Sequence, residues 1–348
     1  MLTEKQIKEF REYLHKAENP LFFHDGDTDG LCSYLLLKKY IGKGKGVIAK
    51  VRFGITETFL RKVKENSPDY IFVLDLPIID QEFIDKVNVP VIWLDHHPPV
   101  KRKGVHYYNP REGSNPDSKP TTYYAYKIAE EKDLLLGSIG CIADWHYPDF
   151  LDNLDKSFPG LLPKKRSGNP EDILFDSKLG DLIKIISFIL KLSLTDIARC
   201  SSIISKIEDP FEIIDQTSPA GKYLNKKVEK IRKEYEWVFK QALKEKPKDG
   251  VLFVKHPHTN HSFVGDLSNE LNYIAKGVLI VAREDDGRMK MSIRSHHIEI
   301  SDIIADSIKG LDGYGGGHEL ACGASVSVKD FDEFLERFKK GVNKKENR

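Results

Sequence analysis

The sequence predicts an α/β protein with a mostly parallel, doubly wound sheet in its first half, a helical middle and a smaller α/β domain at its carboxyl end. In the first half, short apolar runs alternate with helical patterns, which is the order of strand–helix–strand units. The run at residues 70–74 is apolar throughout, as expected for a parallel strand that is buried on both faces. With 348 residues, the chain has ample material for two domains.

The elements of the first half alternate in a regular order. Residues 7–16 have the pattern of an amphipathic helix, and Pro20 ends that region. Strands are expected at 21–23, 47–53, 70–75 and 89–94, with helices between them at 31–40, 57–65 and 79–87. A loop rich in Pro, Gly, Ser and Asn spans 98–120 and leads to helices at 121–132 and 134–145, the first capped by Thr121 or Thr122.

Three of these strands run into acidic side chains. Their ends supply four acids and two histidines: Asp25, Asp27, Asp75, Asp95, His96 and His97. The carboxyl ends of parallel strands meet at one edge of an open α/β sheet, and that edge is where such sheets bind ligands. Strand ends need no carboxylate for packing, so the coincidence predicts a site at this edge. Asp and His together are ligands for divalent metals such as Mn²⁺ or Zn²⁺.

Each motif also has a simpler interpretation. Residues 95–97 are consistent with a polar turn and an incidental histidine pair, because short motifs often occur by chance. Asp25, Asp27 and Asp29 match the start of a calcium-binding loop, but the acid that closes such a loop is missing and a strand precedes it. A solvated acidic turn is the other alternative for these three residues.

Composition narrows the class of protein. Lys and Arg (54) almost balance Asp and Glu (53), so net charge gives no indication of nucleic acid, and a basic surface would have to be local. The four cysteines lie far apart, which argues against disulfides or a thiolate zinc site and fits a reducing cytoplasm. The first residues are polar and charged, and no apolar run reaches the roughly 18 residues of a membrane span. We therefore expect neither a signal peptide nor a membrane partner.

Taken in order, four segments resemble the signature of the DHH phosphoesterase superfamily. They are residues 24–30, Asp75, residues 95–97 and Asp144, which is the only charge in the mostly apolar stretch 134–145. Their order, spacing and strand contexts all agree with that family. The resemblance implies a metal-dependent phosphoesterase with a DHH catalytic domain.

The second half of the chain has a different pattern. Residues 146–248 are mainly helical, and the helix expected at 219–244 interleaves Glu and Lys, which is typical of a bridge between domains. The elements expected after it are a strand at 251–255, a hairpin of 278–283 with 288–294, a helix at 301–309, a strand at 321–328 and a helix at 331–340. The expected domains are a catalytic domain with a helical extension at 1–215, a linker helix at 216–248 and a C-terminal domain at 249–348.

A glycine run, Gly315-Gly316-Gly317, precedes His318 in the C-terminal domain. Glycines allow backbone N–H groups to approach an anion closely, and His318 adds a donor, although a flexible turn is the simpler interpretation. Together with Arg294 on a preceding strand, the run resembles the DHH-associated substrate-binding domain of the RecJ-like branch. The run also argues against family II pyrophosphatases, whose second domain differs.

The resemblance assigns a role to each candidate residue. Five side chains would hold two metal ions, with Asp75 shared between them: Asp25, Asp27, Asp75, His96 and Asp144. Mn²⁺ is the expected ion, with Mg²⁺ as the alternative. We expect catalytic roles for Asp95, which would orient His96, and for His97 and His318, which would contact the substrate phosphate. Asp29 would brace the loop, and domain closure would bring in the substrate-binding set, Arg294, Gly315, Gly316, Gly317 and His318.

The implied activity is that of a two-metal phosphodiesterase, a RecJ-like exonuclease that acts on single-stranded DNA or RNA. Archaeal relatives suggest 3′-to-5′ polarity. The first alternative is a nano-RNase or cyclic-dinucleotide phosphodiesterase that acts on very short oligonucleotides. The second is a non-catalytic replication scaffold of the helicase-subunit type, and the complete set of acids argues against it. A helicase or replisome protein is an expected partner, DNA repair is the expected process, and an oligomer is compatible with the sequence.

Overall fold

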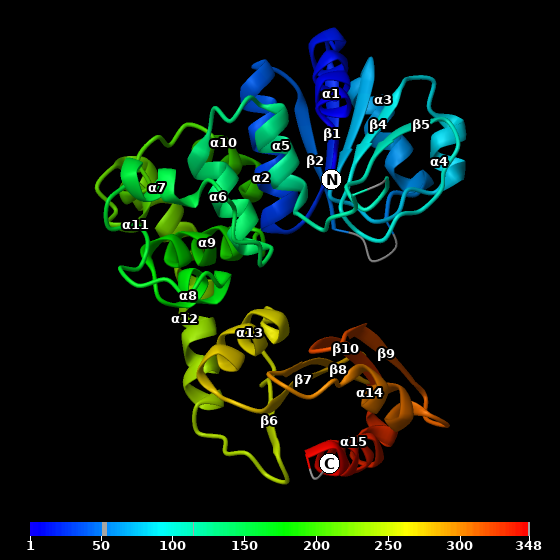
Figure 1. Cartoon of the computed structure of the whole chain (residues 1–348), viewed down its shortest axis with the longest axis vertical. Helices are drawn as coiled ribbons and strands as arrows, with labels where there is room; N and C mark the ends of the chain where they lie inside the picture. The colour runs from blue at the N-terminus through cyan, green and yellow to red at the C-terminus, as the bar shows by residue number, and fades with distance from the viewer. Residues whose placement is uncertain (51–53, 114, 347–348) are drawn as a thin grey trace. The chain divides into compact units, whose positions relative to one another are not determined.

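The computed structural model describes residues 1–50, 54–113 and 115–346. The chain divides into two compact units, Met1–Val228 and Glu229–Arg348, and the division falls within the long helix α12 (Pro219–Ala242). Figure 1 shows the elements of each unit, coloured in chain order. Among the described residues, no helix is both long enough and apolar enough to cross a membrane.

A five-stranded, fully parallel sheet forms the centre of the first unit (Figure 1). Its strands are β1 (Pro20–Asp25), β2 (Lys45–Ala49), β3 (Tyr70–Leu74), β4 (Val91–Leu94) and β5 (Val105–Tyr108), in the order β2-β1-β3-β4-β5. Every pair of neighbours is parallel, which confirms the predicted mostly parallel sheet. Of the strand expected at 47–53, residues 51–53 lie outside the described part of the chain. The prediction of a loop is wrong for residues 105–108, which form the edge strand β5.

Helices cover both faces of this sheet, as a doubly wound fold requires. Phe22 packs against Tyr34 of α2 on one face, whereas its neighbour Phe23 packs against Phe83 of α4 on the other. This follows from the alternation of side chains along a strand. The helices around the sheet are α1 (Glu4–Lys16), α2 (Thr28–Ile41), η1 (Glu57–Phe59), α3 (Leu60–Asn66), α4 (Gln81–Lys86) and α5 (Thr121–Ile128).

The rest of the first unit is helical, which confirms the predicted helical middle. In Figure 1 these helices are green. The apolar helix α6 is buried along most of its length, and it packs against α2 and α5. The helices are α6 (Leu134–Ala143), α7 (Leu151–Ser157), α8 (Pro170–Phe175), α9 (Lys178–Ile189), α10 (Leu194–Ile204) and α11 (Phe211–Ile214).

The second unit contains a mixed five-stranded sheet in the order β6-β7-β8-β10-β9. Only β6 and β7 are parallel, and β7 and β8 form the predicted hairpin. The glycine run belongs to the edge strand β9, which pairs with β10, so it is not the flexible turn of the simpler interpretation. The strands are β6 (Val251–Lys255), β7 (Val278–Asp285), β8 (Arg288–Ser295), β9 (Gly313–His318) and β10 (Ala321–Ser327).

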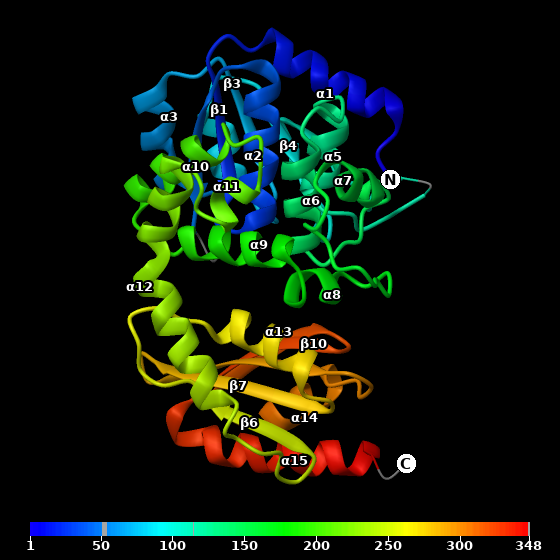
Figure 2. The same cartoon turned by 90° about the vertical axis from the view of Figure 1, so that its left-hand side faces the viewer.

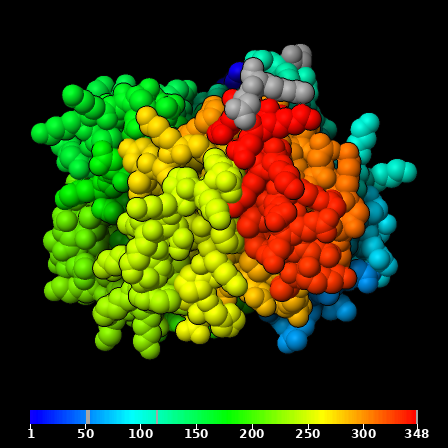
Figure 3. Space-filling view, turned by 90° about the horizontal axis from the view of Figure 1, so that it is seen from below, coloured from blue at the N-terminus to red at the C-terminus, as the bar shows by residue number. Residues whose placement is uncertain are grey.

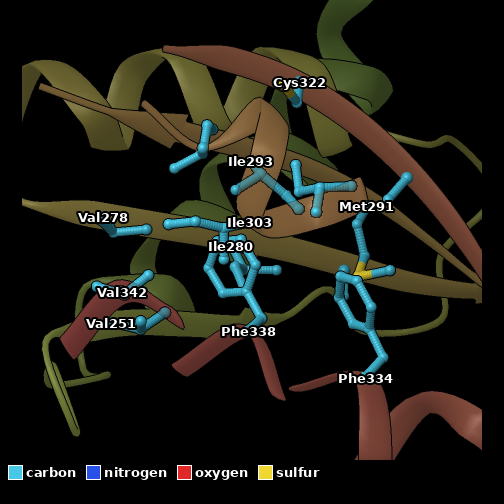
Figure 4. Packing of buried hydrophobic residues seen from close by; sticks show 14 of the residues in the cluster. Val251, Val278, Ile280, Met291, Ile293, Ile303, Cys322, Phe334, Phe338 and Val342 are labelled. Carbon is cyan, nitrogen blue, oxygen red and sulfur yellow. The ribbon is translucent and has the colours of Figure 1, made fainter. Parts of the chain in front are cut away.

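Helices lie on both faces of this second sheet (Figure 2). On one face, Phe338 of α15 (Phe331–Glu346) lies beside Ile280 and Phe334 lies beside Met291 (Figure 4), and Ile303 of α14 (Ser301–Ile308) belongs to the same core cluster. Figure 3 shows α15, in red, along this side of the unit. On the other face, α13 (Val264–Ile274) packs over β7 and β8.

Candidate metal centre

The register of the first sheet places three aspartates side by side. β1, β3 and β4 are neighbours, and their last paired residues are in register. The next residue in each case is an aspartate, so Asp25, Asp75 and Asp95 lie in a row that β5 continues with Asn109. The order of the strands reverses between β1 and β3, which is where open α/β sheets bind ligands. The predicted meeting of three acid-bearing strands is confirmed.

Asp27 and Asp29 are held at the starts of two helices. Asp27 is the N-cap of α2, where its Oδ1 accepts the N–H of Gly30 at 2.9 Å. The Asp29 carboxylate accepts the N–H groups of Thr121 and Thr122 at 3.0 and 2.7 Å. The prediction that Thr121 or Thr122 caps α5 is therefore wrong: both lie inside the helix, and Asp29 satisfies its first turn from outside.

Asp75 lies in the middle of the row, with only 1% of its surface exposed. Its φ is 59°, a left-handed conformation that costs about 1–3 kcal/mol for a residue other than glycine. Its Oδ1 accepts a hydrogen bond from the hydroxyl of Thr121 at 3.1 Å. The strained backbone and this bond together fix the direction of the carboxylate, and such strain is typical of functional sites.

His96 turns one ring nitrogen toward the acids. Its Nε2 lies 3.4 Å from Asp75 Oδ1, 3.6 Å from Asp144 Oδ2 and 3.9 Å from Asp29 Oδ2. Its Nδ1 lies 3.3 Å from the carbonyl oxygen of Ser118, to which it donates. A histidine that donates from one nitrogen to a carbonyl presents the lone pair of the other, which is the usual arrangement of a metal ligand.

His97 has a different partner. Its Nδ1 donates to Asp95 Oδ1 at 2.8 Å, and its backbone N–H donates to Asp95 Oδ2 at 3.2 Å. Tyr107 and Asn109 also donate to Asp95 Oδ2, at 3.3 and 3.4 Å. The expectation that Asp95 orients His96 is therefore wrong, because Asp95 orients His97.

Without a cation, the carboxylates of the cluster repel one another. Burial, followed by the charge of Asp27, raises the pKa of Asp25 to about 6. Burial, with the charges of Asp29 and Asp27, raises the pKa of Asp144 to about 9, and the same causes raise the pKa of Asp75 well above its ordinary value. In the part of the chain that the structure describes, no Lys or Arg forms an ion pair with these acids. Buried carboxylates are costly without a compensating positive charge.

The ligand atoms of the cluster lie close enough together to share cations. Three overlapping groups have their ligand atoms within 4.8 Å of one another: Asp25 with Asp27 and Asp75, Asp29 with His96 and Asp144, and Asp75 with His96 and His97. Asp75 is common to two groups, and its neighbour Asp29, expected only to brace the loop, belongs to a third. Carboxylate oxygens and an imidazole nitrogen suit Mn²⁺ and similar divalent ions, so the residues fit such ions, and metal binding stays a prediction.

His24 precedes this cluster but does not belong to these groups. Its ring is 2% exposed and is stacked on Tyr34 at 4.9 Å. Its Nδ1 lies 2.8 Å from the carbonyl oxygen of Asp25. Burial lowers the pKa of His24 to about 4, so the ring is neutral near pH 7 and serves to pack β1 against α2.

The substrate-binding residues predicted in the second unit lie together at one end of its sheet. Arg294 pairs across strands with Ala321, and Ala321 pairs with His318, so Arg294 and His318 lie on either side of β10. Arg294 Nε donates to Asn269 Oδ1 at 3.0 Å. The carboxyl end of the glycine run is next to this row, and Gly317 has φ of 146°, which favours glycine.

Three residues that hold side chains of the centre in place were not predicted from the sequence. Thr121, Ser118 and Asn109 fix Asp75, His96 and Asp95 respectively. Each acts across a long sequence separation or from the unpredicted end of β5, and no motif marks any of them. The one signal in the sequence for Asn109 is that other strands of the sheet, such as β3 and β4, are also followed directly by a polar residue.

Two family models match the chain. Residues 21–151 match the N-terminal domain of the DHH family, and residues 249–344 match the DHHA1 domain. Together these ranges span most of the chain and include every residue of the candidate centre. The chain belongs to the DHH superfamily, with a DHH domain followed by a DHHA1 domain.

Solved structures share the fold. RecJ from Thermus thermophilus in complex with Mn²⁺ has a TM-score of 0.67 at 16% identity, and the match covers 99% of this chain but 55% of that one. An exonuclease RecJ bound to manganese has a TM-score of 0.60 at 15% identity, covering 98% and 95%. The pGpG-specific phosphodiesterase PggH from Vibrio cholerae has a TM-score of 0.51 at 13% identity, covering 94% and 99%. A search of curated protein sequences finds no match.

Proposed function

We propose that the protein is a two-metal-dependent phosphodiesterase, and that it works as an exonuclease on single-stranded DNA or RNA with 3′-to-5′ polarity. The observation that supports the proposal is the meeting of five side chains at the switch point of the sheet, Asp25, Asp27, Asp75, His96 and Asp144. The DHH and DHHA1 matches and the likeness to RecJ structures support the class of reaction and of substrate.

In the proposed centre, Asp25 and Asp27 would bind one cation each, His96 and Asp144 would complete the second site, and Asp75 would be shared between the two. Two such cations can hold a phosphodiester, activate a water and stabilise the leaving oxygen. The ligand set of four carboxylates and one imidazole favours Mn²⁺, with Mg²⁺ as the alternative. RecJ structures were solved with each of these ions.

His97 contacts the substrate phosphate in this proposal. Asp95 holds its Nδ1, so its Nε2 is left to donate to a phosphate oxygen. Burial alone would lower the pKa of His97, but the hydrogen bond and the charge of Asp95 outweigh burial and raise it. His97 therefore keeps its proton, and its positive charge, to higher pH than an isolated histidine.

The second unit supplies further phosphate contacts in the proposal. Arg294 and His318 flank β10, and the remaining donors are those backbone N–H groups of Gly315, Gly316 and Gly317 that the edge strand β9 does not use in pairing with β10. Arg294 is a fixed cation, and glycine backbone allows close approach of an anion. These residues bind the strand, whereas bond cleavage belongs to the centre in the first unit.

The proposal is tested by replacing Asp75 with Ala and assaying end-labelled single-stranded DNA, RNA and dinucleotides in parallel with Mn²⁺. The wild type is expected to shorten the long strands from the 3′ end, and Asp75→Ala to lose at least about a hundredfold in rate. Asp85→Ala, which changes an exposed acid of α4, is the matched control and should behave as the wild type. Full activity in Asp75→Ala would reject the proposed centre.

A second candidate is hydrolysis of very short oligonucleotides or cyclic dinucleotides. The likeness to a pGpG-specific phosphodiesterase over nearly the whole of both chains favours it. Cleavage of dinucleotides without degradation of long strands would support this alternative. A helicase or replisome protein remains a proposed partner, and a purely structural scaffold is disfavoured because the full set of acids and His96 is present.

A further inference from the structure

The sheet of the second unit has a groove on the face opposite to α14 and α15. The groove has a volume of about 730 Å³ and lies beside the start of α13, over β8, β10 and β9. Cross-strand pairing sets its floor in two rows: Lys290, Ser325 and Tyr314 form one, and Gly323 pairs with Gly316 in the other. Side chains that are paired directly across strands share a face, so these five positions face the groove together.

The glycine row leaves backbone bare in the middle of the groove. A Cβ atom added to Gly316 would meet no atom within 4 Å, and one added to Gly323 would meet only the carbonyl oxygen of Met291, at 3.8 Å. Neither glycine is therefore required by packing on this face. Gly315, on the opposite face, differs, because its Cβ would come within 2.8 Å of Ile304. The bare floor provides room for a ligand against the strands.

Positive charge lies at the side of the groove formed by β7 and β8. Arg283 donates from Nη2 to the carbonyl oxygen of Thr259 at 2.7 Å, and its Nε is buried without a hydrogen-bond partner. Lys290, which is directly opposite Arg283, forms an ion pair with Asp285. Asp285 also lines the groove, and its ion-pair partner is Lys290; within residues 1–50, 54–113 and 115–346 Arg283 forms no ion pair, so its charge can act on an anion that enters the groove.

An aromatic ring lies at the opposite side. Tyr314 of β9 is 47% exposed, and the guanidinium of Arg288 lies 5.4 Å from the centre of its ring. A ring presented in this way next to bare backbone can stack with a planar base. Cation, flat floor and ring thus occur in the order that a nucleotide needs for its phosphate and its base.

We propose that this groove, with Arg283 at one side and Tyr314 at the other, binds a nucleotide of a single strand beyond the one held at Arg294 and His318. The inference rests on the proposed function and extends it to the length of the substrate. Lys290 is four residues from Arg294 along β8, which corresponds to about 13 Å. A dinucleotide held at the Arg294 end gains little from the groove, whereas a longer strand occupies both places.

The test measures binding in the full chain, with cleavage suppressed by Asp75→Asn in every sample. The probes are fluorescein-labelled oligothymidylates, a dinucleotide and a decanucleotide, followed by anisotropy. Tyr314→Ala is expected to weaken decanucleotide binding about tenfold, and Tyr314→Phe, which keeps the ring, to bind as the parent does. Arg283→Gln is expected to weaken binding of the same probe and to reduce the slope of log affinity against log salt by about one. Lys309→Gln removes an exposed charge at the end of α14 and is the control.

Equal decanucleotide affinity in the parent, Tyr314→Ala and Arg283→Gln would overturn the inference. So would competition by polyglutamate as effective as competition by unlabelled strand, because the groove would then be a site for acidic peptide. If Tyr314→Ala does not fold, Arg283→Gln and its salt slope decide the matter alone. If the wild type cleaved no strand, the proposed function would be rejected. The binding measurements would still decide whether the groove holds a nucleotide, because they do not depend on cleavage.

Discussion

Nδ1 of His97 donates to Asp95 at 2.8 Å, whereas the adjacent His96 turns its Nε2 to Asp75 at 3.4 Å. Two consecutive histidines therefore have separate partners and separate proposed roles. In the proposed function, His96 is a metal ligand and His97 is a donor to the substrate phosphate. Asp95 is fully buried and also accepts from Tyr107 of β5 and from Asn109, which follows β5, so this edge strand fixes its direction.

The first prediction concerns this pair. Asp95→Asn and His97→Gln should each lower kcat about 10- to 100-fold, because each removes one half of a coupled donor. The double variant should lose little more than either single variant, since residues that act as a unit are not additive. Steady-state kinetics on a labelled single strand would measure kcat for the wild type, the two single variants and the double variant. Additive losses, or a loss of Mn²⁺ affinity in Asp95→Asn, would contradict the separation of roles.

The second prediction concerns Thr121, whose hydroxyl donates to Asp75 at 3.1 Å. Thr121→Val keeps the shape of the side chain but removes this bond, and Mn²⁺ affinity should fall about tenfold. Thr121→Ser keeps the hydroxyl and should bind nearly as the wild type does. Calorimetric titration of metal-free protein with Mn²⁺ would measure both variants. Equal affinities of the Val and Ser variants would show that Thr121 does not position Asp75.

The third prediction uses two neighbouring glycines of β9. Gly315→Ala should lower the free energy of unfolding by about 1–3 kcal/mol, because the new Cβ would lie 2.8 Å from Ile304 and 3.0 Å from Ala324 and Ile308. Gly316→Ala meets no atom within 4 Å and should change it by less than about 1 kcal/mol. Urea unfolding of the two variants would test this difference. If Gly316→Ala lost more unfolding free energy than Gly315→Ala, the core would have to lie on the face of β9 to which Gly316 belongs, contrary to the structure.

The fourth prediction concerns pH and His256, which is 2% exposed. Its Nδ1 donates to the carbonyl oxygen of Pro257 at 2.6 Å and its Nε2 accepts the N–H of Phe263 at 3.2 Å, so the neutral ring uses both nitrogens. Burial lowers the pKa of His256 below its ordinary value of 6.5. The unfolded chain therefore binds a proton before the folded chain does, and stability is lost as pH falls below 6.5.

Urea unfolding between pH 7 and 5 would measure this loss. His256→Gln should flatten the part of the pH profile below 6.5, whereas His258→Gln, which changes an exposed histidine two residues away, should leave the profile as in the wild type. If the pH dependence of the unfolding free energy were the same in His256→Gln as in the wild type, groups other than His256 would cause the loss of stability in acid.

Sequence patterns were sufficient for the parallel core of the first sheet and for the meeting of Asp25, Asp75 and Asp95. Those predictions depend on local properties, namely apolar runs that form buried strands and the rule that parallel strands end at one edge. The strand β5 could not be predicted in this way, because four residues inside a segment rich in Pro and Gly have no clear period. Because β5 was not predicted, Asn109 was not predicted as a neighbour of Asp95 either; the two lie side by side only because β5 pairs with β4.

Other features depend on contacts between distant segments. The partner of Asp95 is decided by side-chain direction after β4, and spacing alone makes His96 and His97 equally close candidates. Asp29 satisfies the start of α5 across a separation of more than ninety residues. The glycine run is a strand because β10 supplies its hydrogen bonds, whereas its own residues have a low preference for strands.

In the proposed centre, four carboxylates and His96 hold two cations at the switch point of the first sheet. Crystals of the wild type grown with Mn²⁺ would test it most directly, through an anomalous difference map. Two peaks about 3.5–4 Å apart are expected, both in contact with Asp75. A single peak, or peaks that do not contact Asp75, would contradict the proposed centre.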